Sequence, residues 1–330
     1  MRTVILIAVA GIIGLFAILE LGMRSLFGFG NPLIYIGDQK IGYLLAPNQV
    51  TRRFGNKIEI NQYSMRSASI SKKPASSNLR ILLIGDSIAN GGWWTDQKNT
   101  ISNLTAQALV PYLNKLSTPT HDEFTGVEVL NASANSWGPR NELAYLEKFG
   151  SFDSQIIILL INTDDLFSTT PTSLPVGRDR NYPDKKPLFA IAEILERYVF
   201  KQKSIAGLAA IQNEKGDRVG ANLQAIAKIQ EISRKNNSQF LLAMTPLLRE
   251  IGNPGPRDYE ITARKRLINF TQELNITYID FLPILNSLEN PQDLYHDHIH
   301  FNLKGNQVIT NNLTTHLFLL REKFQVLSKK

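Results

Sequence analysis

Five short apolar stretches, each followed by a longer amphipathic segment, constrain the fold of this chain more than any other feature. The stretches are Arg80–Ile84, Val127–Asn131, Gln155–Ile161, Phe240–Met244 and Thr277–Phe281. The third is apolar on both faces, as a central strand of a parallel sheet is. Helical patterns occur at 99–116, 141–149, 223–232 and 259–274. This alternation predicts an α/β fold with a five-stranded parallel sheet covered by helices on both sides.

The N-terminal segment is apolar and long enough to cross a bilayer. Val4–Leu19 contains no charged residue, and its extension to Met23 gives a helix of about 30 Å. Glu20 and Arg24 have the spacing of an i,i+4 ion pair. We expect a retained transmembrane signal anchor at 1–24, with a cleaved signal peptide and a buried core helix as alternatives. The flanking positive charges are nearly balanced, and N-terminal anchors commonly export the domain that follows, so we expect a periplasmic domain.

The rest of the chain divides into a lead-in and a main domain. Residues 25–78 are expected to form a juxtamembrane lead-in and linker, with a short strand at 57–61. Residues 79–330 form the main domain, interrupted by an insertion at about 169–220. Within the insertion, Leu188–Phe200 is a helix dense in apolar residues. It is interpreted as a lid over the site, as a helix lying on the membrane, or as an ordinary helix packed on the sheet.

The charge distribution argues against nucleic acid as a partner. The chain has 36 Lys and Arg against 29 Asp and Glu, and this excess of +7 forms no basic stripe with interleaved aromatic residues. Such a surface is simply solvated, or it attracts anionic lipid headgroups or acidic glycans. Arg249 and Arg257 flank a loop after the fourth stretch, where they either bind an anionic substrate or pair with Glu250 or Asp258. The absence of cysteine excludes a thiol nucleophile, thiolate metal sites and disulfides.

Polar clusters follow the predicted strands at the points where each strand ends. Ser87 follows the first strand, residues 131–136 follow the second, residues 162–165 follow the third, and Asp297 and His300 follow the fifth. The carboxyl ends of parallel strands lie at one edge of a sheet, where such folds bind their ligands. A serine, an imidazole and a carboxylate together supply a nucleophile, its base and the group that orients the base.

The sequences around these residues resemble the SGNH (GDSL-type) hydrolases, a family of serine esterases, lipases and acyl-transfer enzymes. The resemblance covers residues 80 to about 310 and is strongest in Ile84-Gly85-Asp86-Ser87 and in the block from Asp297 to Gly305. It implies a flavodoxin-like three-layer α/β/α fold. It also implies Ser87 as nucleophile, His300 as general base and Asp297 as the partner of His300.

The oxyanion side of the site departs from the family pattern. Ser136 stands where the family has a glycine whose backbone N–H is a donor, and Asp164 stands where it has an asparagine that donates from its side chain. An ionised carboxylate donates no hydrogen bond. Either Asp164 is protonated by burial, or Asn162 or Asn135 supplies the donor, or backbone groups act alone. An inactive descendant that keeps the fold is the remaining alternative.

Two further clusters have competing interpretations. His296, His298 and His300 alternate, so in an extended segment they would share a face and suggest a metal site. A metal site would leave the Ser87 block without a role, so we expect none, and no organic cofactor is indicated. Trp93 and Trp94 follow the serine closely, where they either line a substrate pocket or pack the first loop on the domain.

These observations favour a membrane-anchored serine ester hydrolase that cleaves carboxylic esters through an acyl-enzyme on Ser87. Acyl or acetyl groups on a cell-envelope glycan or lipid are the expected substrates. An O-acyltransferase that uses the same three residues is the alternative, with a polysaccharide hydroxyl in place of water. A third hypothesis, motivated by Asp164, is a non-catalytic envelope binding protein. The expected partners are an ester-bearing small molecule, lipid or glycan, and the membrane.

Overall fold

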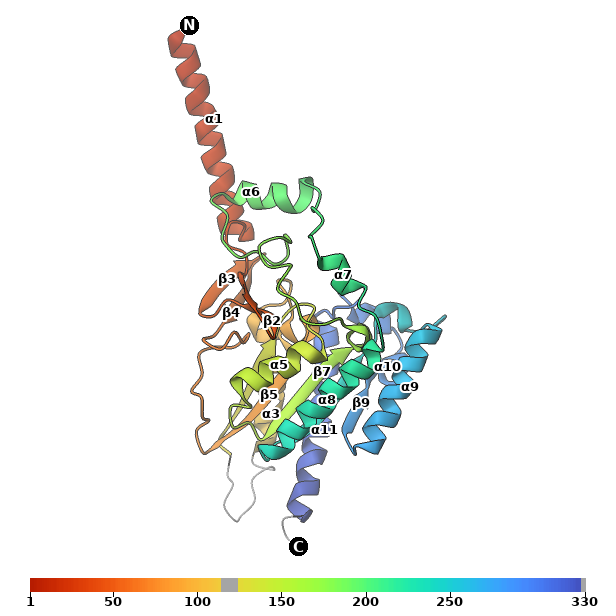
Figure 1. Cartoon of the computed structure of the whole chain (residues 1–330). Helices are drawn as coiled ribbons and strands as arrows, with labels where there is room; N and C mark the ends of the chain where they lie inside the picture. Colours follow the sequence, from red (N-terminus) through yellow and green to blue (C-terminus); the bar gives the residue numbers. More distant parts are fainter. Residues whose placement is uncertain (114–123, 328–330) are drawn as a thin grey trace.

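A five-stranded parallel sheet forms the centre of the molecule, as the sequence predicted (Figure 1). The computed structural model describes residues 1–113 and 124–327. The strands lie in the order β6-β5-β7-β8-β9. Their bounds are β5 Asn78–Gly85, β6 Gly126–Ser133, β7 Ile156–Asn162, β8 Gln239–Thr245 and β9 Thr277–Asp280. Strand β6 lies on one side of β5 and β7 lies on the other, and all three strands are parallel. The order in which strands are added therefore switches sides at β5, and ligands bind in such folds at the carboxyl ends of the strands beside this switch point.

Helices cover both faces of the sheet and complete a three-layer α/β/α fold. One face carries α5 (Pro139–Phe149), α8 (Arg218–Lys235) and α9 (Asp258–Glu273), as Figure 1 shows. The other face carries α3 (Ile101–Leu109), α10 (Phe281–Asn286) and α11 (Leu303–Leu327). Alternate residues of β5 enter the two cores: Leu82 and Ile84 pack under the first set of helices, and Ile81 and Leu83 under the second. The helix expected at 99–116 is α3 with a following 3-10 turn, Val110–Tyr112, and residues 114–116 lie outside the described part of the chain.

Two β-hairpins precede the sheet and pack into the same core. The first joins β1 (Tyr35–Asp38) to β2 (Gly42–Leu45), and the second joins β3 (Gln49–Arg53) to β4 (Asn56–Ile60). The strand expected at 57–61 is β4. Tyr43 and Ile58 are both buried in the cluster that also contains residues of β5 and β7. The lead-in therefore contributes to the core of the molecule.

The N-terminal helix projects from the body, and the insertion lies against its base (Figure 1). Helix α1 (Arg2–Gly22) continues through a π-helical turn, Met23–Phe27. The most apolar 18-residue window of this 26-residue unit has a mean hydropathy of 2.8 and is 6% buried. Its length and composition suit a membrane span, and a signal sequence has the same properties. Glu20 and Arg24 form the expected ion pair at 2.6 Å.

The insertion contains α6 (Ala190–Ile194), a π-helical turn (Leu195–Val199) and α7 (Leu208–Gln212). Helix α6 lies beside α1 and away from the sheet (Figure 1). The carboxylate of Glu20 accepts the N–H groups of Ala190 at 2.7 Å and Ile191 at 3.2 Å. The Phe16 and Phe189 rings meet edge to face at 5.4 Å between centroids. The apolar helix of the insertion is thus joined to the N-terminal helix instead of covering the sheet.

Candidate active site

The turn after β5 presents Ser87 at the start of a short helix, α2 (Ser87–Asn90). Asp86 caps this helix, because its Oδ1 accepts the N–H of Ile88 at 2.8 Å. Gly85 lies so close to β7 that a Cβ atom there would stand 2.5 Å from the carbonyl oxygen of Leu160. In the Gly-Asp-Ser sequence, Gly85 therefore allows β5 and β7 to pack closely, and Asp86 fixes the start of helix α2.

Ser87, His300 and Asp297 lie in one continuous chain of hydrogen bonds. The Nε2 atom of His300 is 2.8 Å from Ser87 Oγ, and its Nδ1 atom is 2.8 Å from Asp297 Oδ2. In the tautomer that donates Nδ1–H to Asp297, Nε2 is free to accept the serine proton. The structure thus brings together, from opposite ends of the domain, the three residues that the sequence selected as nucleophile, base and acid.

The surroundings of Asp297 keep its carboxylate ionised. Burial alone would raise the pKa of Asp297, but hydrogen bonds from the His300 backbone and imidazole and from the Ile299 backbone lower it to about 2. The Oδ1 atom accepts the N–H of Ile299 at 2.9 Å and of His300 at 2.8 Å. These backbone bonds fix the carboxylate, and the carboxylate in turn fixes the imidazole ring.

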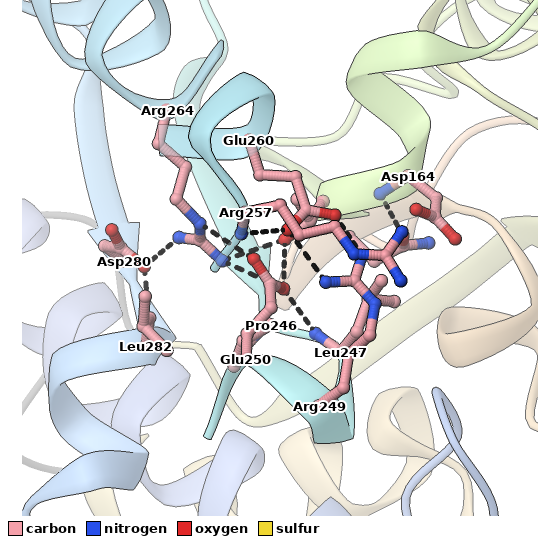
Figure 2. A network of polar contacts seen from close by, with 12 residues as sticks. Asp164, Pro246, Leu247, Arg249, Glu250, Arg257, Glu260, Arg264, Asp280 and Leu282 are labelled. Carbon is pink, nitrogen blue, oxygen red and sulfur yellow. Dashed lines mark hydrogen bonds and ion pairs between the residues drawn. The ribbon is translucent and has the colours of Figure 1, made fainter. Parts of the chain in front are cut away.

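A buried polar network lies under the loop that follows β8 (Figure 2). Glu250, which is fully buried, accepts hydrogen bonds from Thr163 Oγ1 at 2.7 Å and from the N–H of Leu247 at 2.6 Å. Arg264 pairs with Glu250 at 3.3 Å and with Asp280 at 2.9 Å. The network therefore ties the ends of three strands, β7, β8 and β9, to helix α9.

The segment held by this network supports the loop that carries His300. The N–H of Leu248 donates to the carbonyl oxygen of His298 at 3.0 Å. The hydroxyl of Tyr295 donates to the carbonyl oxygen of Pro246 at 2.9 Å. The buried Glu250 therefore supports the position of the imidazole through one backbone–backbone bond and one bond from the Tyr295 side chain.

Ser87 and His300 open into a cavity of about 430 Å³. Trp93 and Trp94 line it, which agrees with the first interpretation of this pair. Trp94 also packs on the histidine loop: its ring lies 4.3 Å from the His300 ring and stacks on His296 at 5.3 Å. The tryptophan therefore shields one side of the imidazole from solvent and forms a wall of the cavity.

Of the residues predicted for the oxyanion side, Ser136 lines the cavity together with Asn135. Ser136 has a φ of 58°, in the left-handed region that favours glycine, so it keeps the backbone shape expected of the residue it replaces. Among the described residues, the backbone N–H groups of Ser87 and Ser136 meet no hydrogen-bond acceptor. Two residues that line the cavity therefore carry unpaired backbone N–H groups, the kind of donor that an oxyanion requires.

Tyrosines from outside the sheet hold this loop in place. Tyr43 from β2 donates to the carbonyl oxygen of Asn135 at 2.6 Å, and Tyr182 from the insertion donates to Ser136 Oγ at 2.9 Å. Neither tyrosine was selected from the sequence, because neither follows a strand of the sheet or belongs to a recognisable motif. Their contribution becomes evident only from the packing of the lead-in and the insertion on the switch point.

Asn162 and Asp164 do not line the cavity. The side chain of Asn162 is buried behind Ser87, where it donates to Asp86 at 2.8 Å and to Asp165 at 3.0 Å. The side chain of Asp164 is exposed near Arg249 (Figure 2). Partial desolvation raises the pKa of Asp164, and the positive charge of Arg249 opposes this increase. Asn162 thus braces the nucleophile turn, and Asp164 faces solvent.

The remaining candidates have other partners. Arg249 pairs with Glu260, and not with Glu250 or Asp258 as the sequence suggested, and its guanidinium lowers the pKa of Glu260 to about 2 (Figure 2). The side chains of the three alternating histidines point to different places: His296 stacks on Trp94, His298 is exposed, and His300 contacts Ser87. Within residues 1–113 and 124–327, no group of three His, Cys, Asp or Glu side chains has the geometry of a metal site.

Comparison with known protein families shows to which family this chain belongs. Residues 83–308, more than half of its length, match the GDSL-like Lipase/Acylhydrolase family. The chain belongs to this family. It is thus a GDSL-type ester hydrolase, as the sequence blocks around Ser87 and His300 indicated, and the hypothesis of a non-catalytic protein is not retained. A search among curated proteins found no match.

Solved structures similar to this GDSL hydrolase are distant. An acetylxylan esterase from Geobacillus stearothermophilus shares 13% identity, with 72% of this chain and 93% of that chain covered and a TM-score of 0.43. The acetyl xylan esterase AlAXEase shares 14%, with 72% and 98% covered and a TM-score of 0.46. A GDSL-like lipase from Bacteroides thetaiotaomicron shares 9%, with 77% and 92% covered and a TM-score of 0.42. At this distance the similarities identify no substrate.

Proposed function

We propose that this GDSL hydrolase cleaves carboxylic esters, carried by a glycan or lipid of the cell envelope, through an acyl-enzyme on Ser87. The observation that carries the proposal is the hydrogen-bonded chain from Ser87 Oγ through His300 to Asp297, on the wall of a cavity. Serine, imidazole and carboxylate in this order form the constellation used for acyl transfer on many unrelated folds.

The first half of the reaction forms the acyl-enzyme. As Ser87 Oγ attacks the ester carbonyl, His300 Nε2 takes the hydroxyl proton, and the carboxylate of Asp297 stabilises the resulting imidazolium. The carbonyl oxygen becomes an oxyanion and accepts hydrogen bonds from the N–H groups of Ser87 and Ser136, with Asn135 beside them. Collapse of the tetrahedral intermediate breaks the bond to the alcohol, which leaves with the proton from His300.

The second half releases the acyl group. A water molecule gives a proton to His300 Nε2 and attacks the acyl carbonyl. As the new intermediate collapses, the bond to Ser87 Oγ breaks and His300 returns the proton to Oγ, which leaves a carboxylic acid and free Ser87. A sugar hydroxyl in place of this water would make the protein an O-acyltransferase. Since both reactions share the acyl-enzyme, the acceptor is decided by measurement of the products.

The test compares the full chain in detergent with Ser87→Ala, and uses Ser287→Ala as a matched serine substitution at an exposed position. We expect a fluorophosphonate probe to label the wild type and Ser287→Ala, and 4-nitrophenyl acetate to be hydrolysed by the same two proteins. Equal labelling of Ser87→Ala would remove Ser87 as the nucleophile. Slow release of acid combined with acetyl transfer to an added glycan would identify the transferase instead.

We further propose that α1 stays in the membrane and holds residues 25–330 outside the cytoplasm, with 25–78 as lead-in and the hydrolase domain from residue 79. The apolar side chains of α1 are exposed, and so are Leu188, Val199 and Phe200 of the insertion beside its base. Side chains of this kind suit the bilayer interface. Carbonate-washed membranes should retain the full chain, and protease added to intact spheroplasts should digest the domain. Release by carbonate would contradict the anchor.

A further inference from the structure

The cavity that contains Ser87 is strongly cationic. Arg53 from β3 and Arg180 and Arg197 from the insertion line it, and none of the described residues on its wall is an aspartate or glutamate. Glu193, which lies behind the wall, is shared: Arg53 binds its Oε1 atom through Nη2, and Arg197 Nε binds the same oxygen at 2.8 Å. The other oxygen of Glu193 accepts the N–H of Gly30 at 2.7 Å. One carboxylate therefore serves two guanidinium groups.

The third arginine has no carboxylate partner among the described residues. Arg180 donates to the carbonyl oxygens of Arg197 at 2.5 Å and Phe200 at 2.9 Å and to the side chain of Gln202 at 3.2 Å. These bonds hold the insertion helix in place, and none of them is to a carboxylate. Taken together, these three arginines and Glu193 carry a net charge of about +2, in partly enclosed surroundings where charge interactions are stronger than in water.

Two of the guanidinium groups have donors left over. Arg53 is buried, with its guanidinium 4.5 Å from the centre of the Phe29 ring. Its Nη1 atom is itself buried and has no hydrogen-bond partner among the described residues, so Arg53 contributes charge while Arg197 presents the accessible donors. Arg197 uses Nε for Glu193, and neither of its Nη atoms makes a hydrogen bond within the described part of the chain. Its side chain is 21% exposed, so the donors remain accessible. Guanidinium groups with free donors are suited to carboxylate and phosphate.

The other lining residues favour a sugar over an acyl chain. Asn31, Thr51, Asn135 and Asn181 provide neutral hydrogen-bonding groups. The tryptophan pair, the tyrosines and two phenylalanines, Phe29 and Phe54, provide flat aromatic faces. The aliphatic lining is limited to Leu33 and Ile58 among the described residues. An acyl chain requires a continuous apolar channel, whereas a ring with hydroxyl groups uses polar donors and acceptors arranged around aromatic walls.

We propose that Arg53 and Arg197, with Glu193 between them, form an anion subsite that binds the carboxylate or phosphate of an anionic sugar whose ester group lies at Ser87. The proposal rests on the ester hydrolysis proposed above and specifies its substrate class: acylated acidic glycans. Arg180 acts as a positioning residue, because it fixes the helical turn that carries Arg197. The subsite belongs to the lead-in and the insertion, and Ser87 and His300 belong to the sheet.

The experiment measures kcat/KM for acetate release from a matched pair, acetylated methyl glucuronoside and acetylated methyl glucoside, by the full chain in detergent. We expect the wild type to prefer the uronate by about tenfold, mainly through KM, since a charge-assisted hydrogen bond has about this effect on binding. The ratio should fall to near one in Arg197→Gln and recover partly in Arg197→Lys. Arg234→Gln, which removes the same charge from the exposed end of α8, should keep the wild-type ratio. An acetylated sugar 6-phosphate distinguishes a phosphate preference from a carboxylate preference.

The outcomes separate the two proposals. If wild type hydrolyses 4-nitrophenyl acetate through Ser87 but treats the charged and neutral sugars alike, the subsite is refuted and the hydrolase stands. A preference for a neutral lipid ester over both sugars also refutes it. If no ester is hydrolysed, the proposed function fails, and calorimetric titration with methyl glucuronoside decides the subsite: binding that Arg197→Gln abolishes supports it, and the absence of binding refutes it.

Discussion

Replacement of Asp297 by asparagine should stop the reaction while leaving the fold intact. The carboxylate holds three hydrogen bonds: two from backbone N–H groups to Oδ1 and one from His300 Nδ1 to Oδ2, at 2.8 to 2.9 Å. The asparagine side chain would keep the backbone bonds through its oxygen but would present an NH₂ group to Nδ1. Two donors then face each other, so the imidazole must protonate at Nε2, which can no longer accept the proton of Ser87.

The expected loss follows from this change of tautomer. A base with the wrong tautomer costs about 10³- to 10⁴-fold in kcat, and the charge that stabilised the imidazolium is also lost. The assays are 4-nitrophenyl acetate hydrolysis and the rate of fluorophosphonate labelling, both at pH 7. Asp293→Asn, the same substitution at an exposed position four residues earlier, serves as the control and should retain full activity.

Residual activity above about one tenth of wild type in Asp297→Asn would refute this reasoning, because it would show that His300 works without an oriented tautomer. Asp86, whose Oδ2 atom lies 3.3 Å from Ser87 Oγ, would then be the next group to test as a proton acceptor. Circular dichroism and the urea midpoint show whether the variant is folded, so that a loss of activity is not confused with a loss of structure.

Four further outcomes are expected. Asp297→Asn should lose about 1 kcal/mol of stability at pH 6 but little at pH 2.5, as measured by urea titration at both pH values. The fold lowers the pKa of Asp297 from 3.8 to about 2, so the stabilisation is present above pH 4 and is lost as pH falls towards 2. The nominal value is roughly 2.5 kcal/mol, and the 36% exposure of the side chain reduces it. Ser136→Gly should keep activity within about threefold and change the free energy of unfolding by less than about 1 kcal/mol. Glycine relieves the strain of the left-handed backbone, and this gain offsets the lost hydrogen bond from Tyr182. A tenfold loss of kcat would show that the hydroxyl itself is needed. Gly85→Ala should destabilise by about 1–3 kcal/mol in thermal unfolding, because its Cβ would collide with β7, and an unchanged melting temperature would contradict the packing. Asp164→Asn should leave kcat within about twofold of wild type, because its side chain faces solvent, and a large drop would assign the carboxylate a role of its own.

The sheet and the three residues around Ser87 were predictable from sequence because each has a local signal. Apolar runs such as 156–162 define a buried strand by composition alone, and the ends of parallel strands must meet at one edge. Ser87 and His300 are then expected to lie close together, although 213 residues separate them in the sequence. Local periodicity and topology were sufficient for the sheet and for the edge where polar residues gather, and the resemblance to the SGNH family supplied the roles of Ser87, His300 and Asp297.

The rest of the site depends on contacts that leave no local pattern. Arg53 and Tyr43 lie in short strands of the lead-in, and their sequences do not show that these strands pack beside Ser87. Arg197 and Tyr182 come from an insertion whose position depends on α1. The partner of Arg249 was mispredicted for the same reason: Glu260 is eleven residues away and becomes the partner only through the fold of the loop before α9.

The bond between α1 and the insertion has a practical consequence for anyone who handles this enzyme. Glu20 and Arg24 are the acceptor and donor for the backbone of residues 188–191, through the N–H groups of Ala190 and Ile191 and the carbonyl oxygen of Leu188. Removal of the first 24 residues to obtain a water-soluble protein leaves these groups unpaired, a few residues before the arginine-bearing turn that lines the cavity. A soluble fragment is thus expected to differ from the intact enzyme in its choice of substrate, and screening libraries of esters against the fragment would sample the wrong selectivity.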